Sequence, residues 1–224
     1  MIVHKKGFYI AIEGIDGSGK SALIKHLAAL IQSGVTTEIV VTKEPGGTEL
    51  GKTLRGLVHD NKAIICDEAE FLLFAADRAQ HIRSVVAPDL KQGKIVISDR
   101  SFISSIAYQG FGRGLDCGVI TTINDWAING VTPDIIFYLE IDPALALGRI
   151  EKRNEAKTSF EREQADFWAR VIEGFNYCCA KYPQVIKLDA SAPEEIVAQN
   201  AFEIVRTHST SLAQGSIRSG RTDM

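Results

Sequence analysis

An eight-residue segment near the N-terminus, GIDGSGKS at residues 14–21, combines glycines with a lysine and a serine. It fits the pattern G-x-x-x-x-G-K-[ST], in which glycines allow consecutive backbone N–H groups to point at a phosphate. In this pattern Lys20 would reach the outer phosphates and the Ser21 hydroxyl would ligate Mg²⁺. An apolar run precedes the segment and an amphipathic helical pattern follows it, as the pattern requires. The residues predicted to hold a nucleoside triphosphate are Gly14, Ile15, Asp16, Gly17, Ser18, Gly19, Lys20 and Ser21.

A second polar pair, Asp99 and Arg100, follows the apolar run KIVIS at residues 94–98. Ligands of open α/β sheets bind at the carboxyl ends of such strands. Asp99 is suited to hold a Mg²⁺-bound water beside Ser21, and the planar guanidinium of Arg100 is suited to a phosphate. A motor ATPase usually has a glutamate here, so the arginine favours transfer to a second phosphate over hydrolysis. The alternative is an Asp-Arg pair that serves the structure alone.

Short apolar runs separated by helix-length segments are typical of an α/β protein. The runs occupy residues 8–12, 38–42, 94–98, 134–141 and 185–189. They do not alternate with polar residues, so we expect parallel strands that helices cover on both faces. Between the runs, residues 23–31 have apolar side chains at helical spacing, and 67–91 predict a long helix kinked near Pro88.

The chain has 224 residues, of which 45% are apolar, and a formal net charge of −3. This length favours one domain, which we place at 1–212, followed by a polar, flexible tail at 213–224. The balanced charge excludes a protein that coats nucleic acid. The N-terminal apolar run is too short for an export signal or a membrane span, and the four cysteines lack C-x-x-C spacing. We therefore expect a cytoplasmic protein with reduced thiols and no nucleic-acid or membrane partner.

Four further segments resemble the bacterial thymidylate kinase family, a branch of the P-loop nucleoside monophosphate kinases. They are TKEPGGT at 42–48, FAADRAQH at 74–81, SDRSFISSIAYQG at 98–110 and TPDIIFYLEID at 132–142. With the glycine-rich segment, the likeness covers residues 7–190 or so. It implies a P-loop NTPase three-layer sandwich of about five parallel strands with a helical lid. It also implies phosphoryl transfer from ATP to dTMP with Mg²⁺, in a homodimer.

The same resemblance implies a dTMP site. Its residues are Asp16, Glu44, Pro45, Arg55, Phe74, Arg78, Arg100, Ser104, Ser105, Tyr108 and Gln109. In the family an aromatic ring stacks on thymine and an arginine one turn later bonds the base, at the positions of Phe74 and Arg78. Their i, i+4 spacing puts both on one helical face, although Phe74 alone would be interpreted as a core residue. Asp16 matches an acidic residue that faces the 3′-hydroxyl of the acceptor sugar.

The family's lid corresponds to residues 149–163, where basic side chains are crowded. Lid arginines neutralise the transferred phosphoryl group in nucleoside monophosphate kinases. The catalytic residues implied are Lys20, Arg153, Arg149 and Arg100, with Arg153 preferred to Arg149 for the lid role. The alternative is a solvated helix face held by salt bridges.

Three positions depart from the family pattern. Gly17 stands where some members carry an arginine, which leaves that charge to the lid. The lid segment RNEAKTSFE lacks the second arginine of RGxLDRFE and is one residue longer, so Lys157 or Arg162 could replace it. Ser101 follows the Asp-Arg pair where tyrosine is common, which could loosen recognition of the sugar.

Two other functions are compatible with these motifs. One is a kinase of a different nucleoside monophosphate or of a deoxynucleoside, and the other is a catalytically silent nucleotide-binding regulator. A nucleoside acceptor brings a neutral hydroxyl and needs a carboxylate base with fewer phosphate-binding groups. The arginines Arg55, Arg78 and Arg100 therefore favour a phosphorylated acceptor.

Overall fold

The computed structural model describes residues 7–59, 65–152, 160 and 163–218. Its strands are β1 Phe8–Glu13, β2 Ile39–Lys43, β3 Ile95–Asp99, β4 Ile135–Glu140 and β5 Val185–Asp189. They form one sheet in the order β2-β3-β1-β4-β5, and every neighbouring pair is parallel. The prediction of five parallel strands is confirmed.

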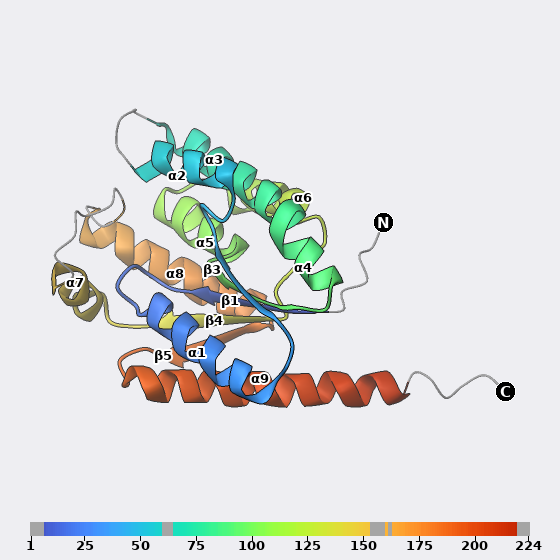
Figure 1. The fold of residues 1–224 in the computed structure, drawn as a ribbon. Coiled ribbons are helices and arrows are strands. Elements are labelled where there is room, and N and C mark those ends of the chain that lie inside the picture. Colours follow the sequence, from blue (N-terminus) through green and yellow to red (C-terminus); the bar gives the residue numbers. More distant parts are fainter. Residues whose placement is uncertain (1–6, 60–64, 153–159, 161–162, 219–224) are drawn as a thin grey trace.

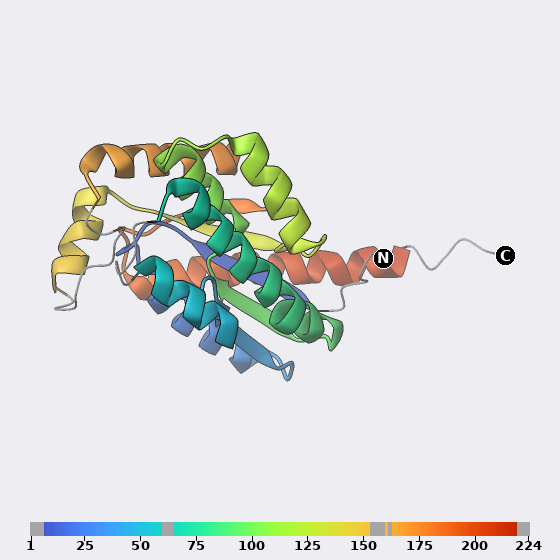
Figure 2. The same ribbon diagram turned by 90° about the horizontal axis from the view of Figure 1, so that it is seen from above.

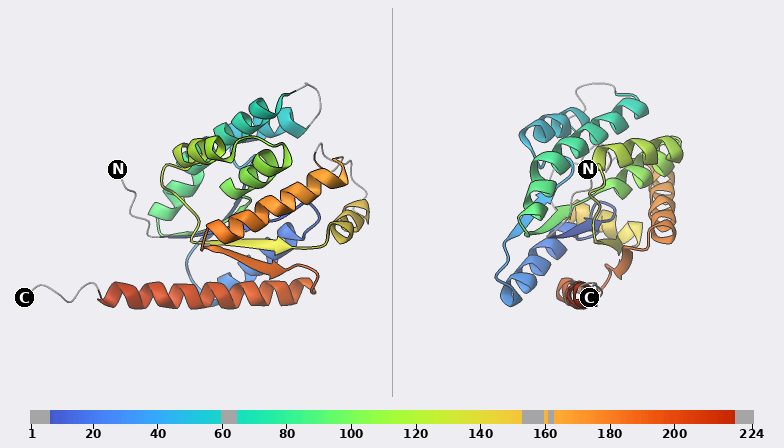
Figure 3. Two further views of the ribbon diagram at one scale, coloured as in Figure 1. Left: turned by 180° about the vertical axis from the view of Figure 1, so that it is seen from behind. Right: turned by 90° about the vertical axis from the view of Figure 1, so that its right-hand side faces the viewer.

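Helices cover both faces of this sheet. They are α1 Lys20–Gly34, α2 Glu49–His59, α3 Asp67–His81, α4 Ala87–Lys91, α5 Phe102–Ser105, α6 Cys117–Ile128, α7 Pro143–Lys152, α8 Ala165–Lys181 and α9 Glu194–Arg218, with π-helical turns η1 Ile82–Val86 and η2 Ile106–Gly112. Figure 1 shows α1 and α9 below the sheet and α3, α5 and α8 above it. The end-on view in Figure 3 separates the three layers of the predicted sandwich. None of the described helices combines the length and apolar character needed to cross a membrane.

Burial explains why the apolar runs do not alternate. In β1 and β4 the side chains from Tyr9 to Ile12 and from Ile135 to Leu139 are almost inaccessible to solvent, because helices pack on both sides. The run at β2 differs from the expectation of full cover. This strand lies at the sheet edge, and Val41 is 54% exposed.

The long helix expected at 67–91 is continuous but changes its hydrogen bonding. The N–H of Ala87 bonds to the carbonyl of Ile82, five residues earlier, so η1 joins α3 to α4. Pro88 follows directly, and its ring cannot tolerate a regular α-helical turn before it. The distortion therefore precedes Pro88.

The topology brings the loops after β1, β2 and β3 to one edge of the sheet. The N–H of Arg100 bonds to the carbonyl of Ile12, and the N–H of Glu44 bonds to the carbonyl of Asp99. Seen from above in Figure 2, α2 and α3 border this edge. At the other end of the chain, α9 continues to Arg218, beyond residue 212 where we placed the domain end, and residues 219–224 lie outside the described part.

Packing of α1 on the sheet gives a test of the core. Leu27 is fully buried, so Leu27→Ala should lower the free energy of unfolding by about 2–5 kcal/mol through lost contacts and a cavity. Ile196→Ala is the control, because Ile196 is 53% exposed, and it should change stability by about 0.5 kcal/mol or less. Denaturant unfolding of both variants measures the difference. Equal losses would contradict the packing of α1.

Candidate active site

A cavity of about 850 Å³ lies at the carboxyl ends of the strands. It is lined by Asp16, Gly17, Gly19, Lys20, Ser21, Ala22, Lys43, Glu44, Pro45, Arg55, Phe74, Asp77, Arg78, Asp99, Arg100, Ser104, Ser105, Tyr108, Gln109, Arg149, Ile150, Lys152, Phe160 and Glu194. One continuous space therefore joins the glycine-rich loop to the side chains predicted to hold a second substrate. Of the predicted triphosphate-binding residues, Gly14, Ile15 and Ser18 do not line it.

The glycine-rich loop runs from the end of β1 to the start of α1. Lys20, the first residue of α1, is buried, and its ammonium donates to the carbonyls of Gly14 at 3.1 Å and Ile15 at 3.0 Å. Burial and the nearby Arg100 lower the pKa of Lys20. Gly14 and Ile15 thus act through their backbone, by holding the lysine at the centre of the loop.

Gly17 packs directly against α7. Its φ is +80°, and a Cβ placed there would lie 2.3 Å from the carbonyl oxygen of Ala146. A side chain at this position therefore collides with backbone. Positive charge comes to the loop from α7 itself, where Arg149 bonds to the carbonyls of Ser18 and Ala190. Arg153, preferred from the sequence, lies outside the described residues, as do Lys157 and Arg162.

Arg100 lies between the two halves of the cavity. Its backbone has a φ of +76°, in the left-handed region that few non-glycine residues adopt. The guanidinium forms an ion pair with Asp16 and donates to Ser104 Oγ at 3.2 Å and to the hydroxyl of Tyr108 at 3.3 Å. It also bonds to the carbonyl of Gly14 at 3.1 Å. The structure thus brings together predicted residues from both substrate sites.

A buried carboxylate holds the chain segment that follows Arg100. Glu13, the last residue of β1, accepts hydrogen bonds from Ser101 N at 2.7 Å, Ser101 Oγ at 3.0 Å and Ser104 Oγ at 2.6 Å. Burial raises the pKa of Glu13 against the effect of Arg100 and these donors. The bonds hold the chain on the C-terminal side of Arg100, where its backbone is strained.

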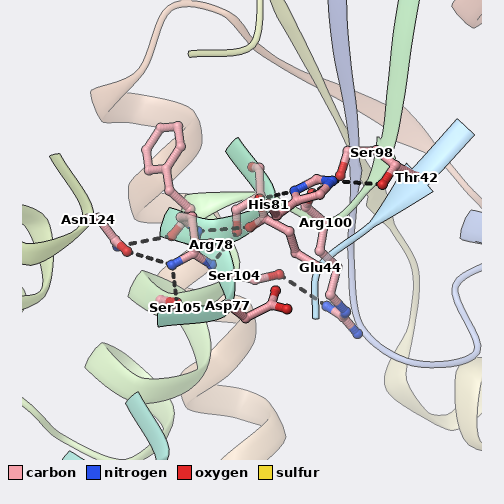
Figure 4. A network of polar contacts seen from close by, with 12 residues as sticks. Thr42, Glu44, Asp77, Arg78, His81, Ser98, Arg100, Ser104, Ser105 and Asn124 are labelled. Carbon is pink, nitrogen blue, oxygen red and sulfur yellow. Dashed lines mark hydrogen bonds and ion pairs between the residues drawn. The ribbon is translucent and has the colours of Figure 1, made fainter. Parts of the chain in front are cut away.

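At the far end of the cavity, Arg78 is fixed by a dense set of acceptors. Nε donates to Glu44 Oε2 at 2.9 Å, and Nη2 donates to the carbonyl of Ser101 at 3.2 Å. Nη1 donates to Ser105 Oγ at 3.1 Å and Asn124 Oδ1 at 2.6 Å (Figure 4). A guanidinium has five N–H groups, so one N–H of Nη2 has no protein partner among the described residues. This donor can serve a ligand in the cavity.

Two aromatic rings border this end. Phe74, one turn before Arg78, is half-buried and lines the cavity. Phe160, from the segment after α7, lies with its ring centroid 6.2 Å from that of Phe74 and 5.4 Å from that of Tyr108. The planes of Phe74 and Phe160 are tilted by 40°, so the two rings form an apolar wall beside Arg78 rather than a parallel slot. An apolar ring next to an arginine donor is suited to a base that carries a carbonyl oxygen.

Comparison with known proteins identifies the family. A family model described as thymidylate kinase matches residues 12–201. The chain is 40% identical over 203 residues to a thymidylate kinase of Halothermothrix orenii, covering 90% of this chain and 97% of that protein. It is 39% identical over 222 residues to one of Nitratidesulfovibrio vulgaris, covering 96% and 99%. The chain belongs to the thymidylate kinase family.

A solved structure agrees with this membership. The crystal structure of thymidylate kinase from Ehrlichia chaffeensis superimposes with a TM-score of 0.71 at 31% identity, covering 89% of this chain and 98% of that chain. The fold is therefore the P-loop NTPase fold of the thymidylate kinase family, as the resemblance implied.

The donor atoms at the loop fit the Mg²⁺ that thymidylate kinase chemistry implies. Asp99 Oδ1 is buried and has no hydrogen-bond partner among the described residues, while the Ser21 hydroxyl faces the same cavity. Those residues contain no group of three His, Cys, Asp or Glu that could hold a metal alone. Two protein oxygens with phosphate and water as the other ligands is the usual manner of Mg²⁺ binding.

The remaining residues predicted for the acceptor line the same cavity, and several of them also contact one another or the cavity wall. Arg55 lines the cavity beside the turn at Glu44 and Pro45, and its Nη1 donates to the carbonyl of Pro45 at 3.2 Å. Gln109 donates to Glu70 Oε1 at 2.9 Å. Both side chains therefore hold the wall of the site together as well as facing it.

Ser101, which stands where tyrosine is common in the family, lies beneath the turn at Arg100. The side chain is 2% exposed, does not line the cavity and bonds to Glu13. Its hydroxyl is small enough to be enclosed beneath the strained turn at Arg100. Serine at this position therefore supports the turn at Arg100 through Glu13, and its effect on recognition of the sugar stays a prediction.

Several residues near the site have no role assigned from the sequence, and the ones whose contacts matter most are Glu13, His81, Asn124 and Phe160. The signal for Glu13 was a lone carboxylate at the end of an apolar strand. His81 is the last residue of the segment FAADRAQH, and the resemblance of that segment to the family implies no role for the histidine. Asn124 and Phe160 gave no local signal, because their partners are distant in the chain.

The contact at Gly17 gives a matched pair of variants. Gly17→Ala should destabilise the protein by about 1–3 kcal/mol and impair ATP use, because it adds a Cβ at positive φ against backbone. Gly148→Ala, in open space on α7, should stabilise it by about 0.5–1 kcal/mol through helix propensity. Thermal unfolding and the KM for ATP check both. A neutral Gly17→Ala would refute the close packing of the loop on α7.

Proposed function

We propose that this protein transfers the γ-phosphoryl group of ATP to dTMP, giving ADP and dTDP. The observation that carries the proposal is that one cavity is lined both by Lys20 of the glycine-rich loop and by Phe74 and Arg78 of α3. Thymine has a flat ring to stack on Phe74 and a carbonyl oxygen to accept the remaining N–H of Arg78. Many relatives named thymidylate kinase, including those described above, agree with this function.

The acceptor phosphate, in this proposal, lies between Arg55 and Arg100. Asp16 accepts a hydrogen bond from the 3′-hydroxyl of the sugar and forms an ion pair with Arg100. Tyr108 has its ring under the Arg100 guanidinium, 5.0 Å from ring centroid to Cζ, and it borders the sugar. Ser104, Ser105, Gln109, Glu44 and Pro45 complete the wall.

Phosphoryl transfer to dTMP requires positioned substrates and positive charge rather than a general base, because the attacking phosphate oxygen is already anionic at neutral pH. Lys20 is proposed to neutralise the transferred phosphoryl group, and Arg100 the acceptor phosphate. For the lid charge Arg153 stays the first candidate from the sequence, and Arg149, which donates to the carbonyl of Ser18 in the loop, is the second. Ser21, and Asp99 through a water molecule, would hold Mg²⁺, which when bound would help to neutralise the charge of the phosphates.

The two other functions are not favoured. A deoxynucleoside kinase needs a carboxylate base at the reacting hydroxyl, whereas Asp16 is held by Arg100. A silent regulator has no use for an intact second substrate site beside a complete phosphate loop.

Two further properties belong to the proposal. We place the protein in the cytoplasm, and we propose a homodimer formed through helices of the upper layer. Large apolar side chains are exposed on three of them, namely Leu57 on α2, Leu72 on α3, and Val119 and Trp126 on α6. Light scattering should then give twice the chain mass of 24.5 kDa, and Trp126→Glu should give the monomer mass. A monomeric parent protein would rule the dimer out.

The activity is tested by ADP formation with ATP, Mg²⁺ and each of dTMP, dUMP, UMP, CMP, AMP, GMP and thymidine. Turnover with dTMP should exceed turnover with each of the other acceptors.

Lys20→Ala should lower kcat by about a hundredfold to a thousandfold without unfolding the protein. Arg78→Ala should raise the KM for dTMP by about tenfold to a hundredfold with little change for ATP. No turnover on any acceptor despite ATP binding would instead indicate the regulator.

A further inference from the structure

His81 occupies a buried position that the proposed reaction does not use. Its imidazole is fully enclosed between the end of β2 and α3 (Figure 4). Nδ1 lies 2.8 Å from Glu44 Oε1, and Nε2 lies 2.7 Å from Thr42 Oγ1. Because an ionised carboxylate only accepts hydrogen bonds, Nδ1 carries the proton that joins His81 to Glu44.

Glu44 passes this contact on to Arg78. One carboxylate oxygen receives the imidazole N–H, and the other receives Nε–H of Arg78 at 2.9 Å. Burial opposes the charge of Glu44, but Arg78 and His81 outweigh it and hold the pKa of Glu44 below its ordinary value. Thr42, His81, Glu44 and Arg78 therefore form one chain of hydrogen bonds, which is buried except at Thr42.

Close contacts fix both His81 and Arg78 in this chain of hydrogen bonds. A Cβ at Gly47 would lie 2.8 Å from His81 Cδ2, so the backbone of the turn rests on the imidazole. Arg78 is held by Ser105, Asn124 and the carbonyl of Ser101 in addition to Glu44. Its one N–H without a protein partner among the described residues consequently has a fixed direction.

We propose that His81 is a positioning residue that fixes the guanidinium of Arg78 through Glu44, and that it thereby sets a preference for a pyrimidine with a carbonyl at C4. This inference rests on the proposed function. A donor held in place bonds to a carbonyl oxygen but opposes an amino group, which is also a donor. A guanidinium free to tilt turns away from the amino group, so discrimination falls.

Two substrates and two variants isolate this effect. dTMP and 5-methyl-deoxycytidine monophosphate differ in the pyrimidine edge at C4 and N3, and the measured quantity is the ratio of their kcat/KM values. In His81→Asn the amide nitrogen takes the place of Nδ1, whereas in His81→Gln it reaches the place of Nε2. We expect His81→Gln to lower the ratio about tenfold and His81→Asn to keep it within about threefold of the parent value.

The KM for ATP should be unchanged in both variants, because the contacts at Lys20 lie elsewhere. An unchanged ratio in His81→Gln would overturn the inference. An equal loss in both variants would also overturn it, since a purely structural histidine would be missed equally in each. Absence of dTMP turnover in the parent protein would refute the proposed function itself, so the two failures are distinguishable.

Two further variants keep the test decisive if the His81 variants do not fold. Glu44→Gln retains the shape of the side chain but removes the shared anion, and it should relax the ratio at least as much as His81→Gln. An unchanged ratio in folded Glu44→Gln overturns the inference. Where His81→Gln does fold, it should cause no further loss in an Arg78→Lys background, and an additive loss would contradict action through Arg78.

Discussion

The guanidinium of Arg100 is the constraint on which both halves of the cavity depend. It joins the glycine-rich loop, through Gly14 and Asp16, to Ser104 and Tyr108 on the acceptor side. Burial opposes its charge, but neighbours led by Tyr108 and Asp16 raise its pKa above the ordinary value. A group that is always charged therefore stands where the two sets of phosphates would meet.

Two buried carboxylates perform parallel tasks at the two ends of this arrangement. Glu13 braces the strained turn at Arg100, and Glu44 braces Arg78. Glu13 accepts hydrogen bonds from Ser101 and Ser104, and Glu44 accepts them from His81 and Arg78, so both buried carboxylates have hydrogen-bond partners. The arginines are thus positioned before a substrate arrives, which reduces the ordering cost of binding.

The sequence predicted what depends on local patterns. The glycine-rich segment is continuous in the sequence, so the loop could be predicted from it. The apolar runs do not alternate with polar residues, so a sheet buried on both faces could be predicted from them. The contacts of Glu13 with Ser101 and of Glu44 with His81 span 88 and 37 residues, and no local pattern reports such pairs. The exposed face of β2 was missed because its composition resembles that of an inner strand, and strand order is a property of the whole sheet. The lid arginine stays a prediction, since Arg153 lies outside the described residues.

The proposed function requires that one cavity binds the phosphate donor ATP and the acceptor dTMP together, with Lys20 at the first and Arg78 at the second. Its most direct test is calorimetric titration with adenosine and thymidine joined through their 5′ positions by a chain of phosphates. One molecule should bind per chain and compete with both ATP and dTMP, and it should bind more weakly to both Lys20→Ala and Arg78→Ala. Binding that competes with ATP alone and ignores Arg78→Ala would contradict the proposed function.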